Sequence, residues 1–257
     1  MYKFSVLQTM TLTAMLLALY IIATRLLGIY ITPYVRFSFG VAILIYSSIL
    51  LGPISGAIIG GVGDILGIVI VNTSGISINP LITLTYFLMG ATPGLLMMLF
   101  KKINQKEKIG LIIYNGLLLL IWSLITGFVF TQDSITLFNS KVVMPLNTLS
   151  RSLVIVITFL LIVGISIFTY FLNAHFFKKY RYNDRIVNVY YVAFIVMVVE
   201  IVFTLFINSL MKVIFYNVAF EIILLPALFL AFIYIPLNTI IISYLFVLTS
   251  KVINLRG

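Results

Sequence analysis

The stretch VRFSFGVAILIYSSILLGPISGAIIGGVGDILG, residues 35–67, decides the fold of this chain. It predicts two apolar helices that meet at a Gly-Pro turn, with Arg36 before the first helix and Asp64 inside the second. A charged side chain within a bilayer is costly unless it faces protein or ligand. The segment therefore predicts a tightly packed membrane hairpin with two placed charges. Four residues recur at i+4 spacing and share one helix face, namely Gly52, Gly56, Gly60 and Asp64.

The composition of the whole chain is that of an integral membrane protein. Of its 257 residues, 63% are hydrophobic and only 9% are charged, whereas soluble proteins contain about 45–50% apolar and about 25% charged residues. Backbone polar groups in lipid need partners within the protein, which leaves helical bundles or closed barrels. The long apolar runs without strict alternation favour helices. The sequence predicts an all-α integral membrane protein with a single transmembrane domain, residues 1–257.

About eight membrane spans of the usual length, roughly 20 residues, can be drawn along the chain. The first lacks a small-residue cleavage site after it, so we expect it to be retained. The second is short, and it requires either burial of its ends in protein or a locally thinner bilayer. The predicted spans are approximately residues 5–30, 37–51, 54–71, 81–100, 109–131, 152–177, 187–208 and 221–249.

The basic residues predict the orientation of these spans. Lysine and arginine accumulate in cytoplasmic loops, and most of them fall on the side that carries the N-terminus. We therefore expect both termini in the cytoplasm, with the loop at Arg36 and the loop at residues 72–80 outside. The net charge of +10 belongs to loops beside the membrane, so lipid is an expected partner and nucleic acid is not. The inner basic residues are Lys3, Lys101, Lys102, Lys106, Lys108, Lys178, Lys179, Arg181, Arg185, Lys251 and Arg256.

Enzyme chemistry finds little support in the sequence. There is no cysteine, and the single histidine, His175, cannot form a metal cluster. The G-x-x-x-x-G-K-[ST] motif for ATP and the G-x-S-x-G motif of hydrolases are both absent from the chain. We expect a protein that is not an enzyme, with no catalytic residues, no metal and no cofactor.

The charges inside the spans have two explanations. Asp64 lies about 15 Å and Glu200 about 20 Å into their spans at the usual helical rise. Each carboxylate either serves the packing of the bundle or contributes to a gate or ligand site. Arg25 and Glu221 fall near the outer ends of their spans, where we expect their side chains to reach the interface.

The outer side of the predicted hairpin has features of a binding cup. Arg36 offers a planar fork for carboxylate or phosphate, and Phe37 and Phe39 beside it can stack on a flat ring. A polar loop at residues 72–80 supplies hydrogen-bonding side chains on the same side. Fixing topology alone is the alternative role of Arg36. The residues that we assign to a ligand site here are Arg36, Phe37, Phe39, Asp64, Asn72, Thr73 and Asn79.

Residues 35–67 resemble the second and third helices of folate-type substrate-binding (S) components of energy-coupling factor (ECF) vitamin transporters. Residues 82–85 and Gly90 fit the fourth helix, and residues 208–226 and 235–238 are similar to the last two helices and their connection. The resemblance covers roughly residues 8–102 and 187–249. Family members usually have six helices, so it implies a six-helix core plus two extra helices, a probable insertion at about residues 109–177.

The resemblance also implies a mechanism and partners. An S component binds its vitamin outside, docks on a transmembrane coupling (T) subunit with two ATPases, rotates, and releases the vitamin inside. Folate or a related vitamin is then the expected ligand, and Asn208 joins the expected ligand site. Ala14 and Ala18 match the A-x-x-x-A docking motif of the first helix, for which ordinary packing within the bundle is the alternative.

Two other classes of protein remain open. A self-contained secondary transporter would use Asp64 and Glu200 in proton coupling. A structural membrane protein that transports nothing would need Asp64 and the polar outer loop for architecture only. Co-purification of a T subunit and ATPases separates the S component from both.

Overall fold

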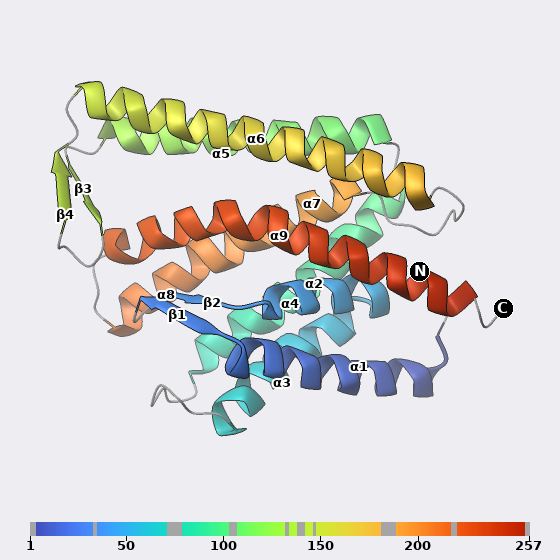
Figure 1. Ribbon diagram of the computed structural model, residues 1–257. Helices are drawn as coiled ribbons and strands as arrows, with labels where there is room; N and C mark the ends of the chain where they lie inside the picture. Colours follow the sequence, from blue (N-terminus) through green and yellow to red (C-terminus); the bar gives the residue numbers. More distant parts are fainter. Residues whose placement is uncertain are drawn as a thin grey trace.

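The computed structural model describes residues 4–32, 35–70, 79–102, 107–131, 134–137, 142–145, 148–180, 189–216 and 220–254. They form an all-α membrane bundle, as predicted, in which long helices lie side by side along a common direction (Figure 1). The helices are α1 Val6–Ile21, η1 Ile22–Leu26, α2 Gly40–Leu51, α3 Pro53–Ile70, α4 Pro80–Lys102, α5 Glu107–Thr131, α6 Thr148–Tyr180, α7 Val189–Val198, η2 Val199–Ile207, α8 Asn208–Tyr216 and α9 Phe220–Asn254, where η marks π-helix.

The predicted spans correspond to these helices. Six helical segments among the described residues are long and apolar enough to cross a membrane, and Gly40–Leu51 and Ile109–Leu124 are shorter apolar helices. The short second span is α2, with only 12 residues. It lies inside the bundle, where Gly40 at its start and Leu50 near its end are buried. Enclosure by protein, the first of the two conditions expected for so short a span, is therefore met.

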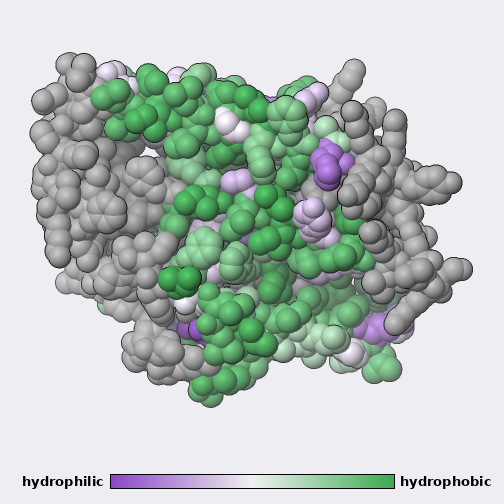
Figure 2. Space-filling model, viewed as in Figure 1, coloured by the Kyte–Doolittle hydropathy of each residue, from purple (hydrophilic) through white to green (hydrophobic). Residues whose placement is uncertain are grey.

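Large apolar side chains cover the outside of the bundle. Exposed leucine, isoleucine, valine, methionine and phenylalanine side chains occur along most of the long helices. In Figure 2 the described surface on the viewer's side is predominantly hydrophobic. Such a surface is stable in lipid, since contiguous apolar areas of this extent are rare on soluble monomers.

Glycines allow α3 to pack closely against two other helices. A methyl group at Gly56 would overlap the carbonyl oxygen of Gly90 in α4, and one at Gly60 would overlap that of Tyr86. The predicted glycine face therefore faces α4. A second glycine face was not predicted: Cβ atoms at Gly63 and Gly67 would lie 2.6 Å from Tyr20 Cδ1 and 2.7 Å from Arg25 Nε. Close approach through small residues is a common basis of helix association in membranes.

Gly52 makes the turn between α2 and α3 rather than forming part of the glycine face. Its φ of 109° lies in the region that favours glycine. Its amide donates to the carbonyl of Ser48, and α3 begins at the next residue, Pro53. Proline is favoured at the first position of a helix. The prediction that Gly52 shares the face of Gly56 is therefore wrong, because the helix starts after it.

Helices α5 and α6 form a layer over α7 and α9 (Figure 1). Two polar pairs connect α5 to α6. The hydroxyls of Tyr114 and Thr169 are 2.9 Å apart, and the Ser166 hydroxyl donates to the Asn115 side-chain oxygen at 2.6 Å. This layer corresponds to the segment expected as an insertion, residues 109–177.

Two short β-hairpins lie at one end of the bundle (Figure 1). Strands β1 Ile29–Thr32 and β2 Val35–Phe37 connect η1 to α2, and strands β3 Ser134–Leu137 and β4 Val142–Pro145 connect α5 to α6. The first turn of α1 and the last turn of α9 lie at the other end. The two ends of the described chain thus lie at the same end of the bundle.

Candidate functional site

An aromatic cluster attaches the first hairpin to α9. The ring of Phe37 stacks on that of Tyr234 with centroids 5.0 Å apart and planes inclined by 12°, and Phe39 meets Phe37 edge to face at 5.3 Å. The backbone amide of Ser38 donates to the Tyr234 hydroxyl at 2.8 Å. Leu230 supports the cluster from one turn earlier in α9. The predicted pair Phe37 and Phe39 is therefore joined by an aromatic residue that the sequence analysis missed.

The position of Arg36 is defined by its backbone. It lies in β2, where it pairs with Tyr30 of β1. The predicted site residues Asn72 and Thr73 lie outside the described residues. The ligand roles of all three remain predictions.

A small cleft opens between α4 on one side and η2 and α8 on the other. Its walls are mostly apolar, and Thr85, Tyr86 and Asn208 add polar groups. Asn208, a predicted site residue, is thus placed on the cleft wall at the junction of η2 and α8. Figure 1 shows that α8 and hairpin β1–β2 lie at the same end of the bundle. The full lining is Ile82, Thr85, Tyr86, Met89, Phe203, Asn208 and Met211.

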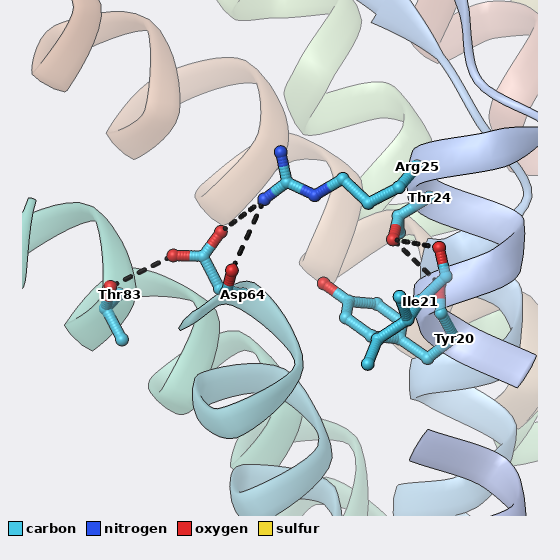
Figure 3. Close-up of polar contacts among 6 residues, drawn as sticks. All are labelled: Tyr20, Ile21, Thr24, Arg25, Asp64 and Thr83. Carbon is cyan, nitrogen blue, oxygen red and sulfur yellow. Dashed lines mark hydrogen bonds and ion pairs between the residues drawn. The ribbon is translucent and has the colours of Figure 1, made fainter. Parts of the chain in front are cut away.

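Asp64 is held by partners within the protein (Figure 3). Its Oδ1 accepts from Arg25 Nη2 at 3.0 Å, and its Oδ2 accepts from the Thr83 hydroxyl at 2.9 Å. The carboxylate is 5% exposed and the Arg25 side chain 13%. Both carboxylate oxygens are thus occupied by groups from η1 and α4. Its predicted role as a ligand contact remains a prediction.

The expectation for Arg25 is corrected by this ion pair. We expected its side chain to reach the membrane interface, but it turns into the bundle. Gly67 leaves room for it, because Cγ of Arg25 lies 3.2 Å from where a Cβ of residue 67 would stand. Pairing with Arg25 spares Asp64 the large cost of an unpaired buried charge. The sequence carried a signal for this pair, since it places an arginine and a carboxylate at comparable distances from the outer side.

Asn79 caps the start of α4. Its side-chain oxygen accepts from the amide of Leu81 at 3.0 Å, and its carbonyl accepts from the amide of Thr83 at 3.0 Å. Asparagine is among the preferred residues at this position of a helix. A local structural function therefore accounts for this residue, and its ligand role stays a prediction.

Ala14 and Ala18 lie on the outward face of α1. Both are exposed, as are Met10, Met15 and Leu19 around them, whereas Tyr20 turns into the core. Ordinary packing within the bundle, the alternative explanation of this motif, is therefore wrong for these two alanines. These two alanines form a ridge on α1, which we call the α1 ridge, and it faces away from the bundle.

The family comparison connects this site to a class of protein. Residues 3–170 match the family model described as ECF-type riboflavin transporter, S component. The chain belongs to this family. It is thus the substrate-binding component of an ECF vitamin transporter, a family of transport proteins that in general act with a vitamin ligand and a T subunit–ATPase module. Neither a curated protein nor a solved structure matches the chain.

The extent of the match to the S-component family is informative. It runs through α1–α5 and most of α6, and so includes residues 109–170, which the sequence resemblance left outside. The description names riboflavin, so the match supports an S component without supporting the folate type. The folate-type resemblance remains a prediction.

Proposed function

We propose that this S component binds a flat, fused-ring vitamin at the hairpin end of the bundle, between the first hairpin, α4, α8 and α9. The observation that carries the proposal is the Phe37–Tyr234 stack, which places a half-buried Phe37 ring against the buried Tyr234 ring at this end. Flat heteroaromatic rings bind well against such side chains. The polar side chains of Thr85, Tyr86 and Asn208 in the neighbouring cleft supply hydrogen bonds that orient a ligand.

Riboflavin and folate are the two vitamins to compare. Riboflavin is supported by the family description, and folate by the motifs of residues 35–67. The two differ in charge, because the glutamate tail of folate carries carboxylates and riboflavin is neutral. Arg36 favours the carboxylate ligand, since a guanidinium binds a carboxylate with two parallel hydrogen bonds.

Transport follows from docking on a T subunit with two ATPases. The outward ridge of Ala14 and Ala18 supports a helix–helix contact with that subunit. No ATP-binding P-loop occurs in the chain, which fits a division of labour with separate ATPases. In this arrangement both termini lie in the cytoplasm, and the hairpin end faces outside.

We also propose that residues 1–257 form one domain in which α5 and α6 are an addition to a six-helix core. Their main contacts are with each other and with α7 and α9. The family match includes residues 109–170, so it does not by itself support an addition, and the proposal rests on these contacts.

One experiment tests the function directly. The purified chain in sealed vesicles should bind riboflavin or folate with one-to-one saturation but should not accumulate it. Accumulation should appear only after a T subunit and both ATPases are added with ATP. Uptake by the chain alone, driven by a proton gradient, would support a secondary transporter instead. Failure to bind any vitamin and to co-purify with a T subunit would support a structural protein.

A further inference from the structure

Glu200 is a buried carboxylate whose charge is not balanced in the way that the charge of Asp64 is. It lies in η2 and is 1% exposed. Its Oε1 accepts from the side-chain nitrogen of Asn238 at 2.8 Å. Its Oε2 is buried and has no hydrogen-bond partner among the described residues. The carboxylate of Asp64, in contrast, forms an ion pair with Arg25. An unbalanced carboxylate at this depth needs a counter-charge.

Further oxygen atoms in the same region also lack partners. The side-chain oxygen of Asn238 and the hydroxyl oxygen of Thr204 are buried, and neither has a hydrogen-bond partner of good geometry in the described part of the chain, although the Thr204 hydroxyl lies close enough to the Glu200 carboxyl to interact with it. Asn238 has no exposed surface. Its side-chain nitrogen donates to Glu200, and its side-chain oxygen is an acceptor. Thr204 lies one turn after Glu200 in η2, and α9, which carries Asn238, packs against η2.

The chemistry of these atoms is that of a site for a small hard cation. Hard cations prefer carboxylate, amide and hydroxyl oxygens as ligands. One carboxylate balances one positive charge, whereas a divalent ion would leave a net charge inside the bilayer. No group of three or more His, Cys, Asp or Glu side chains gathers in the residues that the structure describes, so a divalent site has less support. We propose that Glu200, Asn238 and Thr204 form a Na⁺ site between η2 and α9.

The location of this site gives the cation a role. Phe203, on the cleft wall, lies between Glu200 and Thr204 in sequence, and Asn208, also on that wall, follows one turn later. Glu200, Phe203 and Thr204 all lie in the π-helix η2, and π-helical turns occur often at functional sites. A cation that binds two positions of η2 and one of α9 fixes the helix that carries this wall. Na⁺ therefore raises the affinity for vitamin, and vitamin raises the affinity for Na⁺ by the same factor. This coupling rests on the proposed function, whereas the Na⁺ site does not.

The site is tested first without any vitamin. Thermal unfolding of the purified protein is measured in NaCl, KCl and choline chloride at equal ionic strength, and ²²Na⁺ binding is measured by equilibrium dialysis. We expect one bound Na⁺ per chain and a saturable rise in Tm of about 5 °C in NaCl over choline chloride. Equal Tm values in the three salts, with no bound ²²Na⁺, overturn the site and assign a protonated carboxyl to Glu200.

Variants separate this site from a general effect of salt. Glu200→Gln keeps the shape and the contact with Asn238 but removes the charge, so it should abolish the Na⁺-dependent rise in Tm. Thr204→Val should weaken Na⁺ binding at least about tenfold while the chain still folds. Thr239→Val is the matched control, because this buried hydroxyl bonds to the carbonyl of Ile235 in its own helix. An undiminished Na⁺ response in both Glu200→Gln and Thr204→Val contradicts the proposal.

Vitamin titrations form a separate arm. If Na⁺ binds but no vitamin does, the proposed function fails and the cation site stands. If a vitamin binds equally well in NaCl and choline chloride although Na⁺ binds, the coupling through η2 is wrong. A Kd for vitamin that falls at least about fivefold in NaCl, in wild type but not in Glu200→Gln, supports both the cation site and its coupling to vitamin binding.

Discussion

Arg25 Nη2 and Asp64 Oδ1 lie 3.0 Å apart between η1 and α3, and this ion pair connects the first and third helices inside the bundle. The other carboxylate oxygen bonds to Thr83 of α4. One carboxylate thus joins three helices that are each continuous with a hairpin or loop at the same end. The pair has a direct energetic consequence.

Removing one partner of this pair should destabilise the protein strongly. Arg25→Ala leaves a buried carboxylate without its cation, and such a loss typically costs about 3–5 kcal/mol. The double variant Arg25→Met with Asp64→Asn should be more stable than Arg25→Ala, because no unpaired charge remains. Thermal unfolding in detergent measures both. If Arg25→Ala unfolds at the wild-type temperature, the pair contributes nothing to stability.

Close packing of α3 on α4 should tolerate no added side chain. Gly56→Leu places its Cβ on the carbonyl of Gly90, and overpacking costs about 1–3 kcal/mol or more where backbone must move. We expect a large loss of folded protein in size-exclusion profiles. Gly116→Leu and Gly164→Leu are matched controls, since nothing among the described residues lies within 4 Å of a Cβ there. Equal yields of all three variants would show that the approach of α3 to α4 is not tight.

Substitution of the α1 ridge should separate binding from transport. Ala14→Trp with Ala18→Trp should leave vitamin binding and Tm unchanged, because both side chains face outward. Uptake in cells should be lost, because bulky rings hold the T subunit away. Leu160→Trp on α6, at a position that is 62% exposed, is the control and should transport normally. Normal uptake by the double variant would exclude the ridge as the docking surface.

Arg36 should contribute to ligand affinity. Arg36→Ala should weaken folate binding at least about tenfold, because a charge-assisted hydrogen bond contributes about 1.5–3 kcal/mol. Arg36→Lys should recover only part of this, since an ammonium lacks the planar fork. Riboflavin binding should change little. Titration of both purified variants measures this, with expression recorded separately. Lys141→Ala is the control, because Lys141 lies in the connection between the fifth and sixth predicted spans, which the loop charges also place outside. Full activity of Arg36→Lys, with only lower expression of Arg36→Ala, would indicate a role in topology alone.

Tyr234 should hold the first hairpin in place through two separable contacts. Tyr234→Phe removes the hydrogen bond from Ser38 but keeps the stack on Phe37, so vitamin affinity should fall by a few-fold. Tyr234→Ala removes both and should raise the vitamin dissociation rate further. Stopped-flow fluorescence measures the rates, and Tyr244→Ala, half exposed further along α9, is the control. Equal rates in Tyr234→Ala and wild type would remove the cluster from the site.

The spans and a tightly packed glycine face on α3 could be predicted from sequence because apolar length and glycine spacing indicate them directly, whereas the sequence did not indicate α4 as the helix that packs on this face. The Arg25–Asp64 pair was missed although the similar depths of the two charges were a signal for it, and Tyr234 could not be predicted. Helices that are apolar on every side, such as α9, carry little signal for which face meets the core. The π-turn at Arg25 adds to this difficulty, since it changes the register in which side chains leave the helix. Strands of three or four residues, such as β2, are too short for alternation to indicate them.

The unequal lengths of α2 and α3 create a step within the membrane. Both helices start from the turn at Gly52, but α2 has 12 residues and α3 has 18, so at the usual rise they extend about 18 Å and about 27 Å. The first turn of α2, below the first hairpin, is therefore about 9 Å closer to the Gly52 turn than the far end of α3 is. This difference is more than half of the roughly 15 Å depth of one hydrocarbon leaflet. A solute that rests on the first turn of α2 therefore has a distance to cross toward the Gly52 turn that is about 9 Å shorter than from the far end of α3.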